Sequence, residues 1–239
     1  MAGINASLKI CKKPPFVLKR NEAYIGVLID DLITKGTEEP YRMFTSRAEF
    51  RMLLRQDNAD LRLTEISNNI GLASNDRMSV VLSKKKKTEH MMSFIKNLSI
   101  KPDEINEILI QKGSSPISQS MKLFKLFSRP QLAFNDISTI SSVSNYITEN
   151  NVQKEIIEQV EIQVKYSGYI DKESSNAEKL KALENISIPT NFDYSRLKCL
   201  SSEAKSKLDK VRPVSLSQAS RISGVSPADI SAMLVFMGR

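Results

Sequence analysis

Residues 201–239 read SSEAKSKLDKVRPVSLSQASRISGVSPADISAMLVFMGR and carry the clearest structural pattern in the chain. A serine at a helix start accepts hydrogen bonds from the free N–H groups of the first turn, so a serine before an apolar periodic run predicts a helix start. Such starts occur at Ser201 or Ser202, at Ser215 and at Ser226. Gly224 supplies a turn before the third helix. The segment is therefore predicted to be a three-helix bundle of helix-turn-helix type.

The third helix of this predicted bundle is apolar where a DNA-reading helix would be polar. Its apolar face is formed by Ile230, Met233, Leu234 and Phe236, and no basic residue occurs in it before Arg239. This pattern indicates packing against another helix or a partner protein, and it argues against an independent DNA-binding regulator. The better candidates for binding phosphate precede the helix. They are Lys205, Lys207, Lys210, Arg212 and Arg221.

Most of the upstream chain also follows helical patterns. Its clearest amphipathic helix is marked by apolar residues four apart, namely Val152, Ile156, Val160 and Val164. Further helices are expected around residues 77–98, 102–110, 123–127 and 137–147, whereas the apolar segment 25–33, which ends before Gly36, is either helix or strand. Glycine (8) and proline (9) are both scarce, which favours long helices over many short strands. The predicted fold is all-α.

The chain is basic. Its 239 residues carry a formal net charge of +8, and the sequence pI is about 9.4. A balance of this size favours a polyanionic partner, because phosphates attract clustered lysine and arginine. The lysine run Lys84 to Lys87 is expected to lie on a solvated helix face, where it can add non-specific attraction for phosphates.

A helix is also predicted in the stretch 41–62. Thr45 or Ser46 can cap its start, and Glu49 lies three residues after Ser46, where a capping box needs it. The polar residues Asn58 to Asp60 are expected to end this helix.

This stretch holds five arginines, which are Arg42, Arg47, Arg51, Arg55 and Arg62. On the predicted helix Arg47, Arg51 and Arg55 share one face, because they are four residues apart. Guanidinium groups bind phosphate oxygens in pairs, and interleaved aromatic rings can stack on bases. The interleaved rings are Tyr41, Phe44 and Phe50. The alternative is an internal lattice, with Glu49 paired to Arg47 or Arg51 and Asp60 paired to Arg62. The spacing does not decide between these two interpretations.

No catalytic constellation is predicted. His90 stands alone beside the lysine run and is expected to be exposed and idle, and Cys199 is expected to pack in the core or at its boundary. Asp30 and Asp31 are interpreted as a carboxylate pair on a helix surface rather than as metal ligands or acid–base groups. The sequence holds neither a GxGxxG fingerprint nor a P-loop.

Cysteine usage and hydropathy favour a reducing, cytoplasmic compartment. Cys11 and Cys199 are far apart, and without a CxxC or Cys/His cluster no metal site is predicted. No apolar run approaches the ~18 residues of a membrane span, and the N-terminus lacks the apolar core of a signal peptide.

Three runs of sequence resemble the C-terminal part of the MnmG family, also called GidA. They are residues 21–32 (NEAYIGVLIDDL) with 36–51 (GTEEPYRMFTSRAEFR), residues 54–64 (LRQDNADLRLT) and residues 212–227 (RPVSLSQASRISGVSP). Residues 166–170 (YSGYI) fit the same pattern. The resemblance covers nearly the whole chain.

The resemblance implies a function. MnmG proteins are homodimeric flavoproteins that use FAD, NADH and a folate-derived carbon. With the GTPase MnmE, they install an aminomethyl or carboxymethylaminomethyl group at carbon 5 of the wobble uridine of tRNA. Their C-terminal helical domain contributes to tRNA binding and to docking of the GTPase.

The resemblance also implies a division of the chain. Residues 1–20 would be the remnant of the last flavin-domain helix and a linker, 21–150 a helical domain with the arginine motif, and 151–239 a C-terminal helical subdomain. Gly3 and Asn5 would lie at the edge of the flavin domain. The family's glycine-rich FAD fingerprint and catalytic cysteines are absent from this sequence. We therefore expect a C-terminal fragment or split-gene product that does not bind FAD alone, with the flavin domain in the same or a separate chain.

Two roles follow for the residues named above. In the first, the five arginines of 41–62 and the basic residues of 205–221 contact tRNA, while the apolar face of the last helix docks the GTPase. In the second, the chain is a structural module that docks the GTPase without touching RNA.

Overall fold

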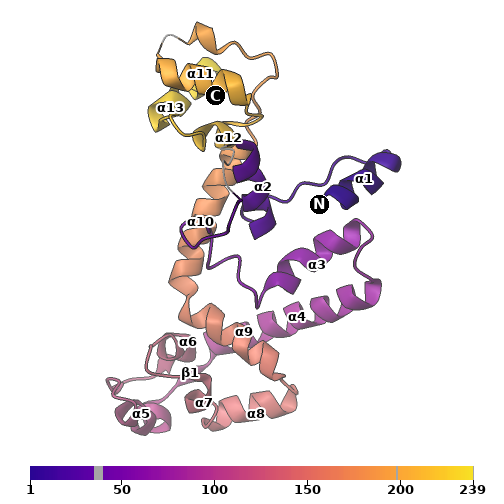
Figure 1. Ribbon diagram of the computed structural model, residues 1–239. Coiled ribbons are helices and arrows are strands. Elements are labelled where there is room, and N and C mark those ends of the chain that lie inside the picture. The colour runs from indigo at the N-terminus through magenta and orange to yellow at the C-terminus, as the bar shows by residue number, and fades with distance from the viewer. Residues whose placement is uncertain (35–39, 198, 239) are drawn as a thin grey trace. The chain divides into compact units, whose positions relative to one another are not determined.

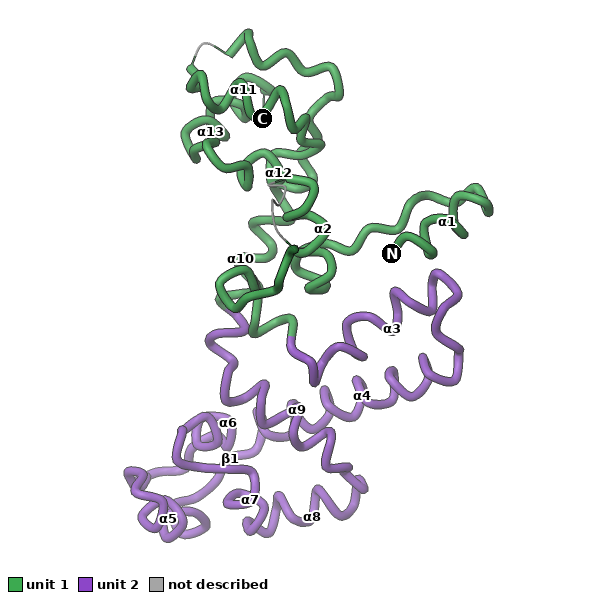
Figure 2. The backbone as a smooth tube through the Cα atoms, in the orientation of Figure 1, with its two compact units in different colours: residues 1–54, 172–239 green, residues 55–171 purple. Residues whose placement is uncertain are grey.

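The computed structural model describes residues 1–34, 40–197 and 199–238, and it is mostly helical (Figure 1). The all-α prediction is confirmed. The chain forms two compact units (Figure 2): unit 1 comprises Met1–Leu54 and Lys172–Arg239, and unit 2 comprises Arg55–Asp171. The domain divisions predicted near residues 20 and 150 stay predictions. The glycine at position 36 of the MnmG-like run lies outside the described residues.

Unit 2 is a helical domain with its own hydrophobic core. Its helices are α3 (Ala59–Asn69), α4 (Asn75–Asn97), α5 (Pro102–Gln111), α6 (Leu123–Phe127), α7 (Phe134–Ile137), α8 (Ser141–Glu149) and α9 (Lys154–Lys165). The long helix α4 packs against α3, α6 and α9. Ile156, Val160 and Val164 are at most 1 % exposed, so the predicted apolar face of α9 is confirmed. A short antiparallel pair, β1 (Ser99–Ile100) with β2 (Met121–Lys122), was not predicted, because two residues are too few for a strand pattern.

The lysine run differs from its prediction at one position. Lys85, Lys86 and Lys87 are exposed on α4, but Lys84 is only 7 % exposed. Its ammonium lies 2.8 Å from a carboxylate oxygen of Asp60 and also pairs with Glu155. Burial alone would lower the pKa of Lys84, but the bonds from these two carboxylates outweigh burial and raise it. Lys84 is therefore a structural residue that ties α4 to α3 and α9.

The C-terminal bundle of unit 1 follows its predicted pattern. Its helices are α11 (Ser202–Val211), α12 (Leu216–Ser220) and α13 (Pro227–Phe236), preceded by the short 3₁₀ helix η1 (Tyr194–Arg196). Ser201, Ser215 and Ser226 each accept a backbone N–H at the helix start. Gly224 has a φ of 92°, which L side chains rarely adopt, so the turn before α13 needs glycine. Cys199 was expected in the core or at its boundary; it is exposed, so the core alternative is wrong.

Unit 1 also contains α1 (Ala2–Ile10), α2 (Tyr24–Thr34) and most of α10 (Ser167–Glu184). The apolar segment 25–33 is thus a helix. Gly26 brings α2 close to the chain that precedes it, because a Cβ at this position would lie 2.4 Å from the carbonyl oxygen of Lys19. A larger residue would force α2 away from that segment.

The helix predicted from Thr45 or Ser46 to Asn58 is wrong. Residues 40–58 form turns and irregular chain, and Asn58 precedes α3 rather than ending a helix. Two observations explain the difference. Phe50 has a φ of +52°, and the N–H of Met52 donates to the carboxylate of Glu173 on α10 at 2.8 Å, so tertiary contacts replace the helical hydrogen bonds. Arg47, Arg51 and Arg55 therefore do not share a helical face.

Candidate nucleic-acid interface

A buried arginine organises the N-terminal part of unit 1. Arg20 is 4 % exposed and pairs with three carboxylates. Its Nε and Nη2 donate to the two oxygens of Glu49 at 2.9 and 2.7 Å. Its Nη1 donates to Asp31 at 2.8 Å and to Asp30 at 2.9 Å. The bidentate pair with Glu49 fixes the orientation of both planar groups, so this side chain ties residues 20, 30, 31 and 49 together.

A second arginine completes this cluster. Arg221, from the end of α12, places Nε 2.8 Å from Asp30 and donates from Nη2 to the same carboxylate at 3.0 Å. Its Nη1 donates to the hydroxyl of Ser217 at 2.5 Å. We call Arg20, Asp30, Asp31, Glu49 and Arg221 the ion-pair network. Because Arg221 neutralises Asp30 inside unit 1, its guanidinium is not free for a phosphate, unlike the role predicted from the sequence.

The network sets the protonation states of its members. Burial alone would lower the pKa of Arg20, but hydrogen bonds from Glu49 and Asp31 outweigh burial and raise it. Asp31 is 3 % exposed, so the expectation of a carboxylate pair on a helix surface is wrong for this residue. The carboxylates here neutralise cations and hold the backbone in place. No acid–base role is needed to explain them.

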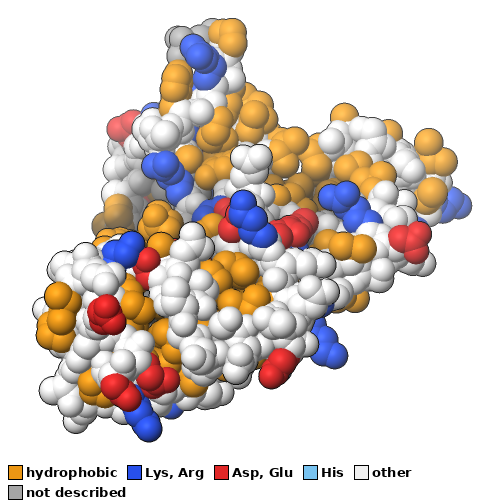
Figure 3. All heavy atoms as spheres, turned by 90° about the horizontal axis from the view of Figure 1, so that it is seen from below, with side chains coloured by type: hydrophobic (Ala, Val, Ile, Leu, Met, Phe, Trp, Pro, Cys, Tyr) orange, Lys and Arg blue, Asp and Glu red, His pale blue; other side chains and the backbone are white. Residues whose placement is uncertain are grey.

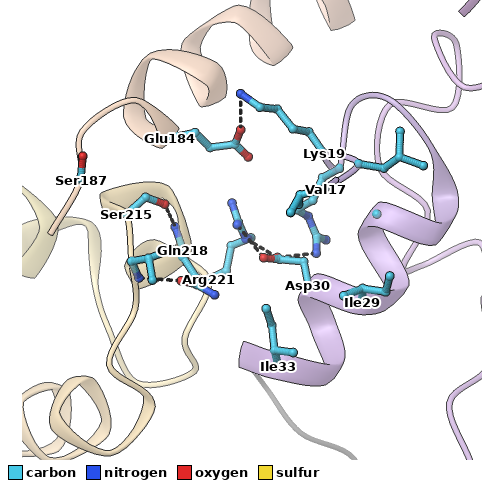
Figure 4. A pocket seen from close by; sticks show the side chains of 14 residues that line it. Val17, Lys19, Ile29, Asp30, Ile33, Glu184, Ser187, Ser215, Gln218 and Arg221 are labelled. Atoms are coloured by element: carbon cyan, nitrogen blue, oxygen red, sulfur yellow. Dashed lines mark hydrogen bonds and ion pairs between the residues drawn. The ribbon is translucent and has the colours of Figure 1, made fainter. Parts of the chain in front are cut away.

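Beside the network lies a hollow of about 350 Å³ (Figure 4). Its apolar walls include Val17, Ile29 and Ile33, and Asp30 and Arg221 face it together. At its edge Lys19 lies 3.5 Å from Glu184. Each cation that Figure 4 shows at this hollow is thus matched by a carboxylate, so the hollow itself is not an attractive site for a polyanion.

An exposed surface of different character follows in the chain. Tyr41, Arg42, Phe44 and Arg47 form what we call the arginine–aromatic strip. The guanidinium carbons of Arg42 and Arg47 lie 5.3 and 5.6 Å from the centroid of the exposed Phe44 ring. Arg47 also lies 4.7 Å from the Tyr41 ring. Nη1 of Arg47 donates to the carbonyl oxygen of Arg42 at 3.0 Å, and within the described residues neither arginine forms a salt bridge with a carboxylate.

Tyr41 belongs to both surfaces. Its ring supports Arg47, and its hydroxyl donates to Asp31 at 2.7 Å. Burial and this hydrogen bond raise the pKa of Tyr41 to about 12, so the phenol keeps its proton at neutral pH. The strip is therefore anchored to the network by a neutral hydrogen-bond donor.

Of the remaining arginines of the 41–62 stretch, one is exposed to solvent and two bond to neighbouring side chains. Arg51 is exposed. In unit 2, Arg55 lies 3.2 Å from Asp57, and Arg62 donates to the side chain of Asn58 at 2.8 Å. The ion pair of Arg55 with Asp57 is internal, but the lattice interpretation did not include it. Glu49 pairs with Arg20, and Asp60 receives Lys84, which are not the partners that the spacing suggested.

The basic candidates of the C-terminal bundle lie on or after α11. Lys210 is exposed, and Lys205 is half-buried. Lys207 pairs with Glu203 at 3.1 Å within the helix, and Arg212 pairs with Asp209 at 2.5 Å. Pairs this exposed contribute little and can be exchanged for a phosphate, so these lysines and Arg212 stay predicted tRNA contacts.

The predicted partner-binding residues fall into two classes. Ile230 and Met233 are buried in the bundle's own core, at 7 % and 0 % exposure. Leu234 is half-buried, and Phe236 is 48 % exposed beside Phe192. A partner that docks on α13 would meet the second class together with Val235, which the sequence argument missed and which is 78 % exposed.

The N-terminal helix does not form a flavin cradle with this chain. A Cβ added to Gly3 would meet no atom within 4 Å, so the described residues make no close approach there. The side-chain amide of Asn5 donates to the backbone oxygen of Phe16 at 2.9 Å and accepts from its N–H at 2.7 Å. The place of Gly3 and Asn5 at the edge of a flavin domain stays a prediction.

Other surfaces are less distinctive. On the face shown in Figure 3, acidic and basic side chains are interspersed. His90 is exposed, as expected, but its Nδ1 lies 2.7 Å from the hydroxyl of Tyr146. Among the residues described here, no group of three or more His, Cys, Asp or Glu side chains is placed to hold a metal ion. No helix in that part of the chain has the length and apolarity that crossing a bilayer requires.

Sequence reasoning missed Arg20. This residue stands one position before the MnmG-like run and has no acidic residue beside it at helical spacing. Its partners lie 10, 11 and 29 residues further on, so no local period links them. The pair Asp30-Asp31 on an otherwise apolar helix was the available signal, because a buried carboxylate needs a cation.

The fold and these surfaces define a basic, two-unit helical module. Two family models match successive segments of the chain: "tRNA modifying enzyme MnmG/GidA C-terminal helical domain" over residues 75–174, and "tRNA modifying enzyme MnmG/GidA C-terminal helical bundle" over residues 176–239. The chain belongs to the MnmG/GidA family, of which it carries the C-terminal helical domains.

Individual relatives agree with this assignment. The "tRNA uridine 5-carboxymethylaminomethyl modification enzyme MnmG" of Christiangramia forsetii is 62 % identical over 100 % of this chain, and that of Flavobacterium johnsoniae is 63 % identical. The chain spans 38 % of the length of each. The form II crystal structure of Aquifex aeolicus GidA is 37 % identical, with a TM-score of 0.79 over 100 % of this chain and 36 % of that one.

Proposed function

We propose that this chain is the tRNA- and partner-binding part of a flavoprotein that modifies carbon 5 of the wobble uridine in tRNA. The observation that carries the proposal is the arginine–aromatic strip. Two guanidinium groups flank an exposed aromatic ring, which is the combination that binds backbone phosphates and stacks on unpaired bases. An anticodon loop offers both chemistries together.

The proposal includes the partners that the family resemblance implies. FAD and NADH would serve the full-length enzyme through a flavin domain outside this sequence, in the same or a separate chain. A homodimer in the cytoplasm would act together with an MnmE-like GTPase. The exposed end of α13, with Leu234 and Phe236, is the proposed docking face for the GTPase. Arg51, Lys205 and Lys210 are proposed as additional tRNA contacts.

A competing function is a structural module that docks the GTPase without touching RNA. The network supports this alternative, because Arg20 and Arg221 are used internally. The strip favours RNA binding, because nothing inside the described residues neutralises Arg42 or Arg47.

The test is tRNA binding by the full chain over a series of salt concentrations. In the variant R42A/R47A, we expect weaker binding to an unmodified tRNA transcript and a salt slope smaller by about one unit for each lost phosphate contact. A matched control, R77A/K125A, removes the same charge from exposed residues of unit 2.

The control separates local contact from net charge. An equal loss in both variants would mean that only the overall charge matters, and unchanged binding by R42A/R47A would favour the structural alternative. Phe44→Ala adds a charge-free readout, because loss of one stacked base costs about 1–3 kcal/mol without a change in salt slope.

A further inference from the structure

Unit 2 has a basic hollow of its own, separate in sequence from the strip. It has a volume of about 370 Å³ and is lined by Ser83, Lys86, Lys87, His90, Tyr146, Asn150 and Val152. Four of these residues lie on α4 at positions i, i+3, i+4 and i+7, so one helical face forms one wall. The end of α8 and the residues after it form the other wall.

The charges of this hollow are all of one sign. Lys86 and Lys87 are exposed, and within the described part of the chain neither is in an ion pair. No carboxylate lines the hollow. Lys84 on the same helix is the instructive contrast, because it is buried and is neutralised by Asp60 and Glu155. The helix thus uses one lysine for structure and leaves two that face a concave surface without a counter-charge.

The hollow also has a fixed hydrogen-bonding wall. Tyr146 stacks on Phe94 with ring centroids 3.9 Å apart and an interplanar angle of 12°, which holds its hydroxyl in place. That hydroxyl lies 2.7 Å from Nδ1 of His90, so the imidazole ring is oriented as well. When the tyrosine donates this hydrogen bond, the ring proton of His90 resides on Nε2 and is free to donate to an anion.

We propose that this hollow binds phosphate groups of the RNA backbone, as a second tRNA contact on unit 2. Two ammonium groups, an imidazole, a serine hydroxyl and an amide supply the donors that a phosphate needs, while the phenol of Tyr146 orients the imidazole. Val152 is the single aliphatic side chain of the lining, and the other six lining residues each carry a polar or charged group. The inference rests on the proposed function and adds a specific site to it.

The single histidine of the sequence makes this site directly observable. Isotope-labelled histidine gives one imidazole signal, which reports on the hollow alone. In the full chain, we expect an unmodified tRNA transcript to shift this signal. Inorganic phosphate at low concentration should not displace the tRNA from the hollow and should therefore not reverse the shift. The variant K86A/K87A should lose the shift, and its salt slope for tRNA binding should fall by about two units.

The control variant is K85A/K125A, which removes two exposed lysines of unit 2 that do not line the hollow. It should keep the His90 shift. Since all four lysines are exposed, thermal melts of both variants should match the parent chain. A shift with inorganic phosphate but not with tRNA would overturn the assignment in favour of a small phosphorylated ligand. A signal that moves with neither would overturn the site.

The two proposals fail in distinguishable ways. If tRNA binds and R42A/R47A weakens that binding while the His90 signal stays fixed, the hollow is not a site and the proposed function stands. If the parent chain does not bind tRNA at all, the proposed function fails, and this inference fails with it.

Discussion

The ion-pair network and the arginine–aromatic strip are built from the same residue type within one unit, yet they use it in opposite ways. Arg20 is 4 % exposed and meets three carboxylates, whereas Arg42 is exposed and meets an aromatic ring. A carboxylate neutralises the charge of an arginine and occupies its N–H donors. An aromatic face orients the guanidinium without accepting those hydrogen bonds. The partner of an arginine, rather than its spacing, therefore decides whether it serves the fold or a ligand.

The largest expected effect comes from removing the centre of the network. Arg20→Met keeps the aliphatic volume but removes the buried cation that Asp30, Asp31 and Glu49 share, so we expect unit 1 to lose about 3–5 kcal/mol of stability. Hydrogen exchange of α2 measures this, because that helix carries Asp30 and Asp31. Arg42→Met is the matched change in the strip and should stay within about 0.5 kcal/mol. Similar exchange rates in the two variants would erase the distinction between network and strip.

A smaller effect is expected at Tyr41, where the two regions meet. Tyr41→Phe keeps the ring beneath Arg47 but removes the hydrogen bond to Asp31, which should cost about 1.5–3 kcal/mol because the acceptor is charged. The same variant should remove the tyrosine that titrates near pH 12, as followed by ultraviolet absorbance of tyrosinate. If RNA affinity falls as far as in R42A/R47A, the anchor matters to the strip as much as the charges do. Unchanged affinity would show that the strip holds its shape without the anchor.

The smallest effect is expected at the rim of the network. Glu49 is the most exposed of the three carboxylates, with 40 % of its side chain accessible. Glu49→Gln keeps one acceptor for Arg20, and solvent screens what is lost, so we expect a cost of at most about 1 kcal/mol in urea denaturation. A loss of stability as large as that of Arg20→Met would contradict the idea that a residue of the ion-pair network contributes more to stability the more deeply it is buried.

The helices that could be predicted are those whose signal is local. The serine caps of α11, α12 and α13 and the four-residue period of α9 each lie within a few residues of the structure they determine. The stretch 45–58 has an equally good local signal, but its backbone bonds to Glu173 and its Glu49 bonds to Arg20. Contacts with residues distant in sequence override the local helix signal there, and a short stretch of sequence does not reveal them.

The candidate site residues show the same difference between partners that are near in sequence and partners that are distant. Arg42, Phe44 and Arg47 lie together because they are neighbours in sequence, and their role in binding stays a prediction. Arg221 was assigned to phosphate, because its partner Asp30 is distant and its charge looked free. Lys86 and Lys87 were interpreted as a solvated face, because the second wall of their hollow comes from residues 146–152.

Unit 1 is assembled from two segments of the chain with the whole of unit 2 between them. The ion pair between Arg221 and Asp30 spans 191 residues of sequence. During synthesis, Asp30 therefore leaves the ribosome long before Arg221 exists, while every residue of unit 2 has already emerged and can fold. Unit 2 can therefore fold before unit 1 is complete, and in a nascent chain stalled before α12 Asp30 would have Arg20 but not Arg221 as a cation partner.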